Sequence, residues 1–226
     1  MREIFSSQAF GIMLTLLFYL IGGWLYKKTK FPFFSPLLVA TLLLMGYILI
    51  ADINMATFLT DLSGIHLFLG PLIVSLAVPI IKQIDLIKKN ILPILVGSIV
   101  GALSSIFAVF VLGSWFNLEQ VILNSIIPKA STTPIAIEVS EQLGGIRAIT
   151  VAVVVMTAVI GAVIVPILVK IIRIKDPIII GMGLGTTSQA VGTAKALEID
   201  PTAGAISGVA LVFTGIATAI IALFIH

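Results

Sequence analysis

The stretch AITVAVVVMTAVIGAVIVPILVKII, residues 148–172, decides the fold class of this chain. Its single charged residue is Lys170, close to the C-terminal end. A helix of this length extends about 37 Å, which exceeds the roughly 30 Å of hydrocarbon in a bilayer. A run this long and this apolar is typical of a membrane-spanning helix and does not suit the surface of a soluble protein.

The composition of the whole chain indicates the same surroundings. Hydrophobic residues make up 59% of the 226 residues and charged residues only 10%, whereas a soluble domain carries about 25% charged residues. The mean hydropathy is +1.24. So few ionic side chains cannot cover a water-facing surface of this size, and lipid must therefore surround most of the chain. The net charge of +3 belongs to short loops, and we expect no nucleic-acid partner.

The chain lacks the residues that most cofactor and metal sites require. It contains no cysteine, and its two histidines, His66 and His226, lie far apart in sequence. Disulfides, thiol catalysis and a histidine-based metal site are therefore not expected. No Ser/His or His/Asp motif of a known catalytic kind is present, so we expect neither an enzyme nor a cofactor.

Apolar segments on both sides of the opening stretch predict the rest of the architecture. They predict helices at 8–26, 36–51, 65–81, 91–112 and 202–224, and an apolar, glycine-interrupted segment at 176–200. The first run is too long for a cleaved signal, and basic residues follow it rather than precede it. We therefore predict an all-α polytopic bundle with about 7–8 membrane segments, a single transmembrane domain over residues 1–226, in the plasma membrane.

Basic residues decide how the irregular region 117–145 is threaded. If it crosses the membrane once, Lys170, Arg173 and Lys175 lie outside, against the positive-inside rule. If it enters and returns, nine of the 13 Lys and Arg residues lie inside. We therefore predict a re-entrant hairpin with arms 119–127 and 134–143, with the N-terminus outside and the C-terminus in the cytoplasm. A single tilted, kinked helix is the alternative.

The tip of this hairpin, PKASTTP at 128–134, is the first polar break. Pro128 and Pro134 disfavour a continuous helix. Pro134 suits the first turn of a new helix with Thr133 as its N-cap, and the free N–H groups there attract an anion. Lys129 adds a full positive charge. The candidate substrate-binding residues of this segment are Lys129, Ser131, Thr132 and Thr133.

The second polar break is GTTSQAVGTAK at 185–195. Gly185 permits the helix to unwind, and Gln189, Gly192 and Thr193 would share one face of the resumed helix. Here the candidate substrate-binding residues are Thr186, Thr187, Ser188, Gln189 and Thr193, with Thr187 or Ser188 as the cap. The alternative is structural, because Ser and Thr in membrane helices often bond to the preceding turn and Gly often marks tight packing.

Three charged residues near these segments are candidates for ion coupling or for a structural role: Glu138, Lys195 and Glu198. Lys195 is placed to approach Glu198, three positions further on. The two stretches that begin at residues 68 and 183 share an outline of broken helix, polar turn and small-residue-rich helix. This likeness predicts an inverted repeat with halves of about 1–115 and 116–226, as in many secondary transporters.

Three stretches together resemble the LrgB/CidB family: PKASTTPIAIEVSEQLGG at 128–145, RIKDPIIIGMGLGTTSQAVGTAKALE at 173–198 and GAISGVALVFTGI at 204–216. The chain also looks like the C-terminal membrane portion of the plant plastid glycolate/glycerate transporter. The resemblance implies either antiholin-like modulation of murein hydrolases and autolysis, or transport of small carboxylates. It also implies a small LrgA/CidA-type membrane partner. The family usually has histidine where this chain has Gln189, so a proton-relay role of that histidine does not carry over.

Two functions from different classes follow. The leading hypothesis is a secondary transporter of small monocarboxylates such as pyruvate, glycolate or glycerate, coupled to H⁺ or Na⁺ and assembled as a dimer. The alternative is a holin/antiholin-like regulator of murein hydrolase activity and autolysis. A holin needs no substrate-sized polar pocket, and the two polar breaks therefore favour the transporter.

Overall fold

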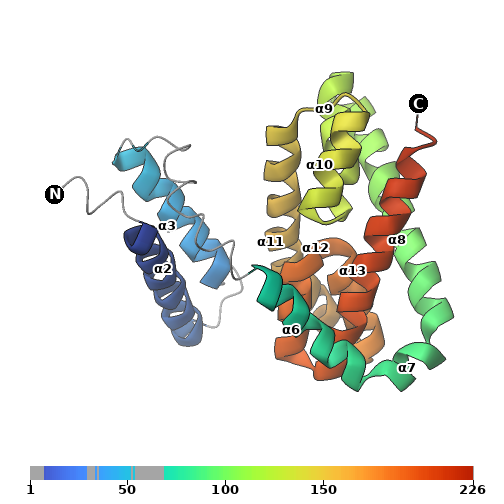
Figure 1. Ribbon diagram of the computed structural model, residues 1–226, viewed down its shortest axis with the longest axis horizontal. Helices are drawn as coiled ribbons and strands as arrows, with labels where there is room; N and C mark the ends of the chain where they lie inside the picture. Colours follow the sequence, from blue (N-terminus) through green and yellow to red (C-terminus); the bar gives the residue numbers. More distant parts are fainter. Residues whose placement is uncertain (1–7, 30–33, 35, 52, 54–68, 226) are drawn as a thin grey trace. The chain divides into compact units, whose positions relative to one another are not determined.

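The computed structural model describes residues 8–29, 34, 36–51, 53 and 69–225, and the regular elements within these ranges are all helices. The chain divides into two compact units, Met1–Ser75 and Leu76–His226. Figure 1 shows the helices of each unit. The predicted start of the helix at 65–81 and His66 lie outside the described residues.

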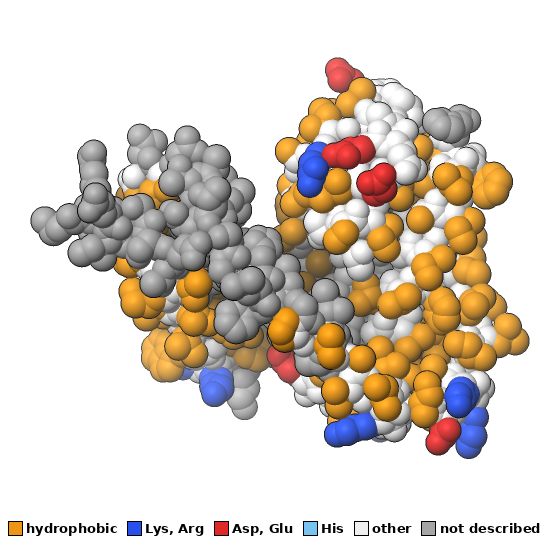
Figure 2. Space-filling view, viewed as in Figure 1, with side chains coloured by type: hydrophobic (Ala, Val, Ile, Leu, Met, Phe, Trp, Pro, Cys, Tyr) orange, Lys and Arg blue, Asp and Glu red, His pale blue; other side chains and the backbone are white. Residues whose placement is uncertain are grey.

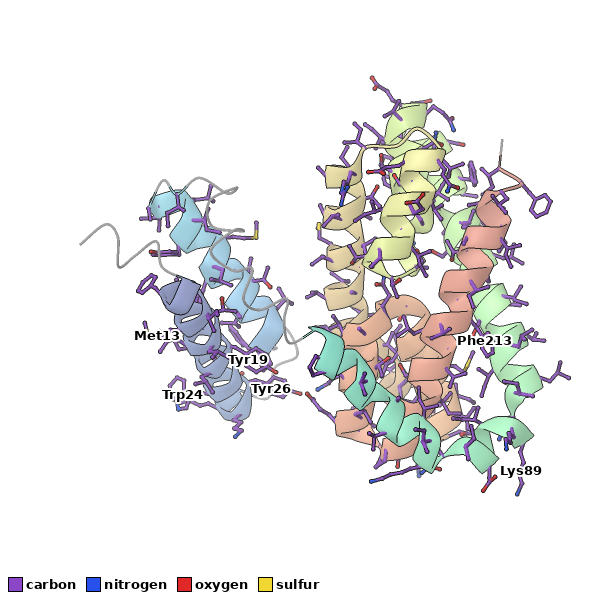
Figure 3. All side chains as sticks on the ribbon, in the orientation of Figure 1. Met13, Tyr19, Trp24, Tyr26, Lys89 and Phe213 are labelled. Atoms are coloured by element: carbon purple, nitrogen blue, oxygen red, sulfur yellow. The ribbon has the colours of Figure 1, made fainter. Side chains whose placement is uncertain are left out.

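The first unit contains an antiparallel helix pair, α2 (Gln8–Thr29) and α3 (Pro36–Ile50). The rings of Phe10, near the start of α2, and Tyr47, near the end of α3, lie 6.4 Å apart. At the other end, Gly22 lets α2 approach the backbone of Pro36. There the Lys28 ammonium lies 5.1 Å from the ring of Trp24, which Figure 3 labels. Both helices match the predicted ranges to within three residues.

The second unit begins with three consecutive helices, of which the first crosses the boundary between the units. These are α6 (Leu69–Lys82), α7 (Ile84–Lys89) and α8 (Ile91–Trp115). The chain continues through α9 (Gln120–Ile126), the 3₁₀ turn η2 (Ile127–Ala130), α10 (Thr133–Gln142), α11 (Arg147–Ile172), α12 (Pro177–Ile199) and α13 (Pro201–Ala222).

Four helices of the described part are long and apolar enough to cross a membrane: α2, α8, α11 and α13. On the face shown in Figure 2, apolar side chains cover the middle of the second unit, and charged side chains gather at its two ends. This distribution suits a helical membrane bundle. The count of 7–8 membrane segments and the inverted repeat stay predictions.

Residues 117–145 form a helical hairpin. The backbone is extended at Ser131 (φ −101°, ψ 169°), between η2 and α10. At the open end, the Asn124 side-chain amide donates to the Leu143 carbonyl at 2.5 Å, and the Ile146 N–H donates to Ser125 Oγ at 2.7 Å. The predicted arms are confirmed, and a single kinked helix is wrong. The predicted cap is one residue off: Thr132 precedes α10, without a side-chain capping bond, and Pro134 lies in the first turn.

A second hairpin lies within α12, where the sequence predicted an interrupted segment that crosses the membrane. The backbone of Gln189 leaves the helical region (φ 52°, ψ −135°). Gly192 then packs directly against the backbone of Leu184, eight residues earlier, although eight residues of a continuous helix span about 12 Å. Ala196 accordingly shares a core cluster with Ile180 and Leu184. The chain therefore reverses at Gln189, and the second half of α12 runs back along the first.

The predicted unwinding at Gly185 is wrong. Gly185 is helical and buried, and it lets α12 approach the backbone of Ser207 on α13. A Cβ at Gly185 would lie 2.9 Å from Ser207 Cα. The glycine serves close packing, and the break comes four residues later, at a residue that does not favour one.

The two hairpins open at opposite ends of the unit. At one end the start of α8 packs with the starts of α12 and α13, where Ile94, Ile178 and Ala205 belong to one cluster. At the other end Leu123 and Leu143 pack with Ile221. Because α11 connects α10 at the second end to α12 at the first, the hairpin tips approach each other from opposite directions (Figure 1).

This topology corrects the predicted position of the C-terminus. The predicted cytoplasmic C-terminus requires residues 176–200 to cross the membrane, so that the final helix ends on the side of Lys170 and Arg173. Because α12 turns back instead, α13 ends near Leu123 and Leu143, at the end of the unit where α11 begins. The C-terminus and the basic residues at the end of α11 therefore lie at opposite ends. The absolute orientation stays a prediction.

Candidate functional site

The two polar segments predicted from the sequence meet where the hairpin tips meet. The side-chain amide of Gln189 donates a hydrogen bond of 3.1 Å to the main-chain oxygen of Lys129. Lys129 belongs to η2, which contacts α8, α9, α10, α11, α12 and α13. The contact between η2 and α12 therefore lies inside the second unit, among five other helical segments.

Gln189 adopts a backbone conformation that a side chain rarely takes. Its φ of 52° lies in the left-handed region, where a residue other than glycine carries a cost of about 1–3 kcal/mol. The residue is 5% exposed. The hydrogen bond from its side-chain amide to Lys129 and the packing of Gly192 on Leu184 both require this turn. Together they offset the strain.

The Lys129 ammonium takes no part in the Gln189 hydrogen bond, which uses the Lys129 main-chain oxygen. It donates a 3.0 Å hydrogen bond to the hydroxyl of Ser105 on α8, and the residue is partly buried. Three of the segments that contact η2 contain no charged residue: α8, α9 and α13. The charged residues of α10, α11 and α12 are exposed or paired with one another: Glu138, Glu141, Arg147, Lys170, Lys195 and Glu198. Within the described residues, Lys129 thus has no carboxylate partner.

The hydroxyls of the first tip differ in what they contact. Ser131 is fully buried and donates to the Pro128 carbonyl at 2.9 Å, which closes the turn. Thr132 and Thr133 are partly buried at the start of α10. The N–H groups of this first helical turn lack intrahelical partners, so they and the two threonines can face an anion held by Lys129.

At the second tip two of the predicted residues make the hydrogen bonds that the structural alternative expects. Thr186 and Thr187 donate to the carbonyls of Met182 and Gly183 at 2.8 and 2.6 Å. The hydroxyl of Ser188 is buried, lies 3.2 Å from that of Thr187, and packs against α11 at Gly161. Ser188 therefore anchors the tip to α11.

Hydrogen bonds of Thr193 and Ser207 connect the second tip to α13. The Thr193 hydroxyl lies 3.1 Å from the Gln189 carbonyl, to which it donates, and 3.0 Å from the Ser207 hydroxyl on α13. Thr193 and Ser207 are fully buried. These hydrogen bonds fix the turn at Gln189 to α13. They therefore hold the backbone of Gln189 in place while its side-chain amide bonds to Lys129.

The three candidate coupling residues lie apart from the tips. Glu138 is exposed, accepts from Gln142 at 3.3 Å, and lines an apolar groove between α10 and α13. Lys195 and Glu198 form the predicted ion pair at 2.7 Å. Lys195 is six residues beyond Gln189, about 9 Å along a helix.

Sequence reasoning missed Ser105, whose hydroxyl forms a hydrogen bond with Lys129 Nζ. The signal was present in the small-residue stretch Gly97–Ser105 of α8, where a hydroxyl in a membrane-length helix needs a partner. Ser207 is not among the predicted site residues either, although its hydroxyl contacts that of Thr193. Neither residue stands out without its partner on another helix.

The site thus offers one ammonium, one fixed carboxamide and the starts of two helical segments, α10 and the second half of α12. Helix starts and an ammonium favour a negative charge, and a single cation suits a singly charged anion. In the described part of the chain no group of three or more His, Cys, Asp or Glu side chains could hold a metal ion.

Comparison with known proteins agrees with the resemblance seen in the sequence. The model of the LrgB-like family matches residues 15–226. Antiholin-like protein LrgB of Bacillus cereus (strain B4264) is 35% identical over 213 residues, which are 94% of this chain and 93% of the relative. The protein of the same name from Bacillus anthracis (strain A0248) matches equally well. No solved structure matches the chain. With its long apolar helices, this multi-pass membrane protein therefore belongs to the LrgB-like family.

Proposed function

We propose that the chain is a secondary transporter of small monocarboxylates of the pyruvate, glycolate and glycerate class. One observation carries the proposal: the hairpin tips meet through Gln189 and Lys129, and the Lys129 ammonium has no carboxylate partner among the described residues. In a low-dielectric interior such a charge needs an anion. The Lys129 ammonium would bind the substrate carboxylate, and the Gln189 amide and the hydroxyls of Thr132 and Thr133 would complete the site.

The arrangement of the hairpins supports alternating access. Transporters often bind substrate where broken helices from inverted repeats meet near the midplane. Two long helices, α8 and α11, are each followed by a hairpin, and this order supports such a repeat. Its two units would be α8–α10 and α11–α12, instead of the halves 1–115 and 116–226. One side-chain hydrogen bond joins the packed tips, and a rocking motion can break that bond at a cost of about 1 kcal/mol.

Uptake by proteoliposomes tests the transporter. Vesicles with the purified protein should take up labelled pyruvate or glycolate with saturable kinetics, and Lys129→Met should abolish that uptake. Lys170→Met is the matched control, because Lys170 is exposed at the end of α11; it should transport like the wild type. Saturable uptake that survives in Lys129→Met would remove Lys129 from the site, and no uptake by the wild type would refute the transporter.

A second function is favoured by a different observation. The relatives at 35% identity are named antiholin-like protein LrgB, and this name supports an antiholin-like regulator of murein hydrolase activity and autolysis more directly than a transporter. In that role the chain would act with a small LrgA/CidA-type membrane protein, and a dimer is the proposed assembly.

Autolysis assays test the second function. Deleting the chain should raise the rate of detergent-induced lysis and the murein hydrolase activity of the medium, and the wild-type chain should restore both. If Lys129→Met restores lysis control as well as the wild type does, regulation does not need the transport site. If only the transport-competent chain restores it, the regulation follows from transport.

A further inference from the structure

We propose that Lys129 carries the coupling proton, so that each monocarboxylate crosses the membrane together with one H⁺. This inference rests on the proposed transporter and specifies its coupling ion. The Lys129 side chain would be an ammonium when a carboxylate is bound and a neutral amine when the site is empty.

The charges around Lys129 support this role. Helices α8, α9 and α13 offer no titratable group to η2. Of the other segments around η2, α10 carries Glu138 and Glu141, α11 carries Arg147 and Lys170, and α12 carries Lys195 and Glu198. Glu138 and Lys170 are exposed, and the other four form two ion pairs, Glu141–Arg147 and Glu198–Lys195. Within the described residues, Lys129 is therefore the titratable group at the contact between the tips.

An empty site and an occupied site differ in charge balance. An ammonium withdrawn from water without a counter-charge is unfavourable, and such a group tends to become neutral. A bound carboxylate supplies the counter-charge within the site. Substrate binding and protonation of the lysine therefore stabilise each other, which is the thermodynamic requirement for coupling.

The hydrogen-bond partner of Lys129 suits both states. A serine hydroxyl can accept a hydrogen bond from an ammonium and can donate one to a neutral amine. Ser105 Oγ lies 3.0 Å from Lys129 Nζ and can therefore hold the side chain in either state. A carboxylate at the Ser105 position would instead stabilise the ammonium permanently and compete with the substrate.

The transport cycle balances in charge. On the loading side the neutral amine takes H⁺ from water as the carboxylate binds, and the occupied site carries no net charge. On the other side the carboxylate leaves and the ammonium returns its proton to water. The empty transporter then reorients with a neutral amine. One H⁺ and one monoanion move together, so transport is electroneutral.

Measurements on the wild-type protein give the first test. Proteoliposomes that hold a trapped pH dye should accumulate labelled glycolate when the outside is acidic, with one H⁺ entering per glycolate. A potassium–valinomycin potential should not change the rate. Passive entry of the free acid is subtracted with liposomes that contain Lys129→Met. Saturable uptake that ignores the pH gradient, or that responds to the potential, overturns the inference and leaves the transporter intact.

The arginine variant gives the second test, because a guanidinium stays protonated. Lys129→Arg should still exchange labelled for unlabelled glycolate across preloaded vesicles, but it should lose at least 90% of accumulation driven by pH. Lys170→Arg, the matched control, should keep both activities. Accumulation retained in Lys129→Arg overturns the inference. If that variant does not insert into the membrane, the number of H⁺ that enter per glycolate in the wild type tests the inference: one supports it, and none overturns it. No uptake by the wild type under any gradient refutes the transporter and this inference together.

Discussion

The side-chain amide of Gln189 donates a hydrogen bond to the main-chain oxygen of Lys129, 60 positions earlier in the chain. The bond joins the tips of two hairpins that enter the second unit from opposite ends. Because it uses the lysine carbonyl, it leaves the ammonium to Ser105 and to an anion. The same pair of residues therefore provides the contact between the tips and the charge of the site.

The strained turn at Gln189 predicts an unusual order of stabilities. Gln189→Ala and Gln189→Gly both lose the side-chain hydrogen bond to Lys129, but only glycine adopts φ 52° without strain. The glycine variant should therefore be more stable than the alanine variant by about 1 kcal/mol, measured by thermal unfolding in detergent. Both variants should lose substrate uptake.

Val155 provides the control for this order. It is exposed and helical in the middle of α11, where glycine costs about 1 kcal/mol relative to alanine. Val155→Gly should therefore be less stable than Val155→Ala. If the two pairs of variants show the same order, the chain does not turn at Gln189 as described.

Glycine at position 192 is predicted to be required for the second hairpin. An added Cβ would lie 2.7 Å from Ser188 Cβ and would also meet the Leu184 backbone. Overpacking of this kind costs about 1–3 kcal/mol, so Gly192→Ala should lower the unfolding temperature. At Gly183 of the same helix, the nearest neighbour of a Cβ is Val165 Cγ1 at 3.4 Å. Gly183→Ala should be neutral or stabilising, and equal losses for both would argue against the hairpin.

The first hairpin is fixed to α11 by a buried bond from the Thr150 hydroxyl to the Ser140 hydroxyl at 2.6 Å. Thr150→Val leaves the buried Ser140 hydroxyl without this partner, which costs about 1–3 kcal/mol. Thr150→Ser keeps a hydroxyl and should recover most of the loss in thermal unfolding. Thr157→Val, two turns further along α11, changes the same atoms outside this bond and should have a smaller effect. A loss of equal size at Thr157 would mean that the Ser140 bond contributes little.

Cysteine labelling tests the topology, because the chain has no cysteine of its own. Leu223, at the end of α13, and Arg147, at the start of α11, are both exposed, as is Lys89 at the end of α7 (Figure 3). Leu223→Cys and Arg147→Cys should react with an impermeant maleimide from the same side of the membrane. Lys89→Cys should react from the other side. Labelling of Leu223→Cys together with Lys89→Cys would restore the predicted crossing by residues 176–200.

The long helices could be predicted from the sequence because their signal is local. The runs that form α8 and α11 are apolar over a bilayer thickness, and polar or basic residues follow them, so their predicted ranges match to within three residues. The first hairpin was also predictable. Pro128 and Pro134 break the helix, and the basic residues at the end of α11 exclude a simple crossing.

The second hairpin could not be predicted in the same way. Residues 176–200 are long enough for a crossing helix, and glutamine is not a residue that marks a left-handed turn. The reversal at Gln189 depends on contacts with distant residues. Gln189 bonds to Lys129 in the first tip, Thr193 contacts Ser207 on α13, and Ser188 packs against Gly161 on α11. Ser105 became a site residue for the same reason, through its contact with Lys129.

The sequence by itself therefore determined the helical membrane bundle, the family and the two polar segments, because composition, periodicity and proline act within a few residues of where they stand. Only the tertiary structure decided where α12 turns, at which end the chain finishes, and which hydroxyl contacts Lys129. These features depend on hydrogen bonds and close packing between residues far apart in the chain. The energy of such contacts exists only once the helices are assembled.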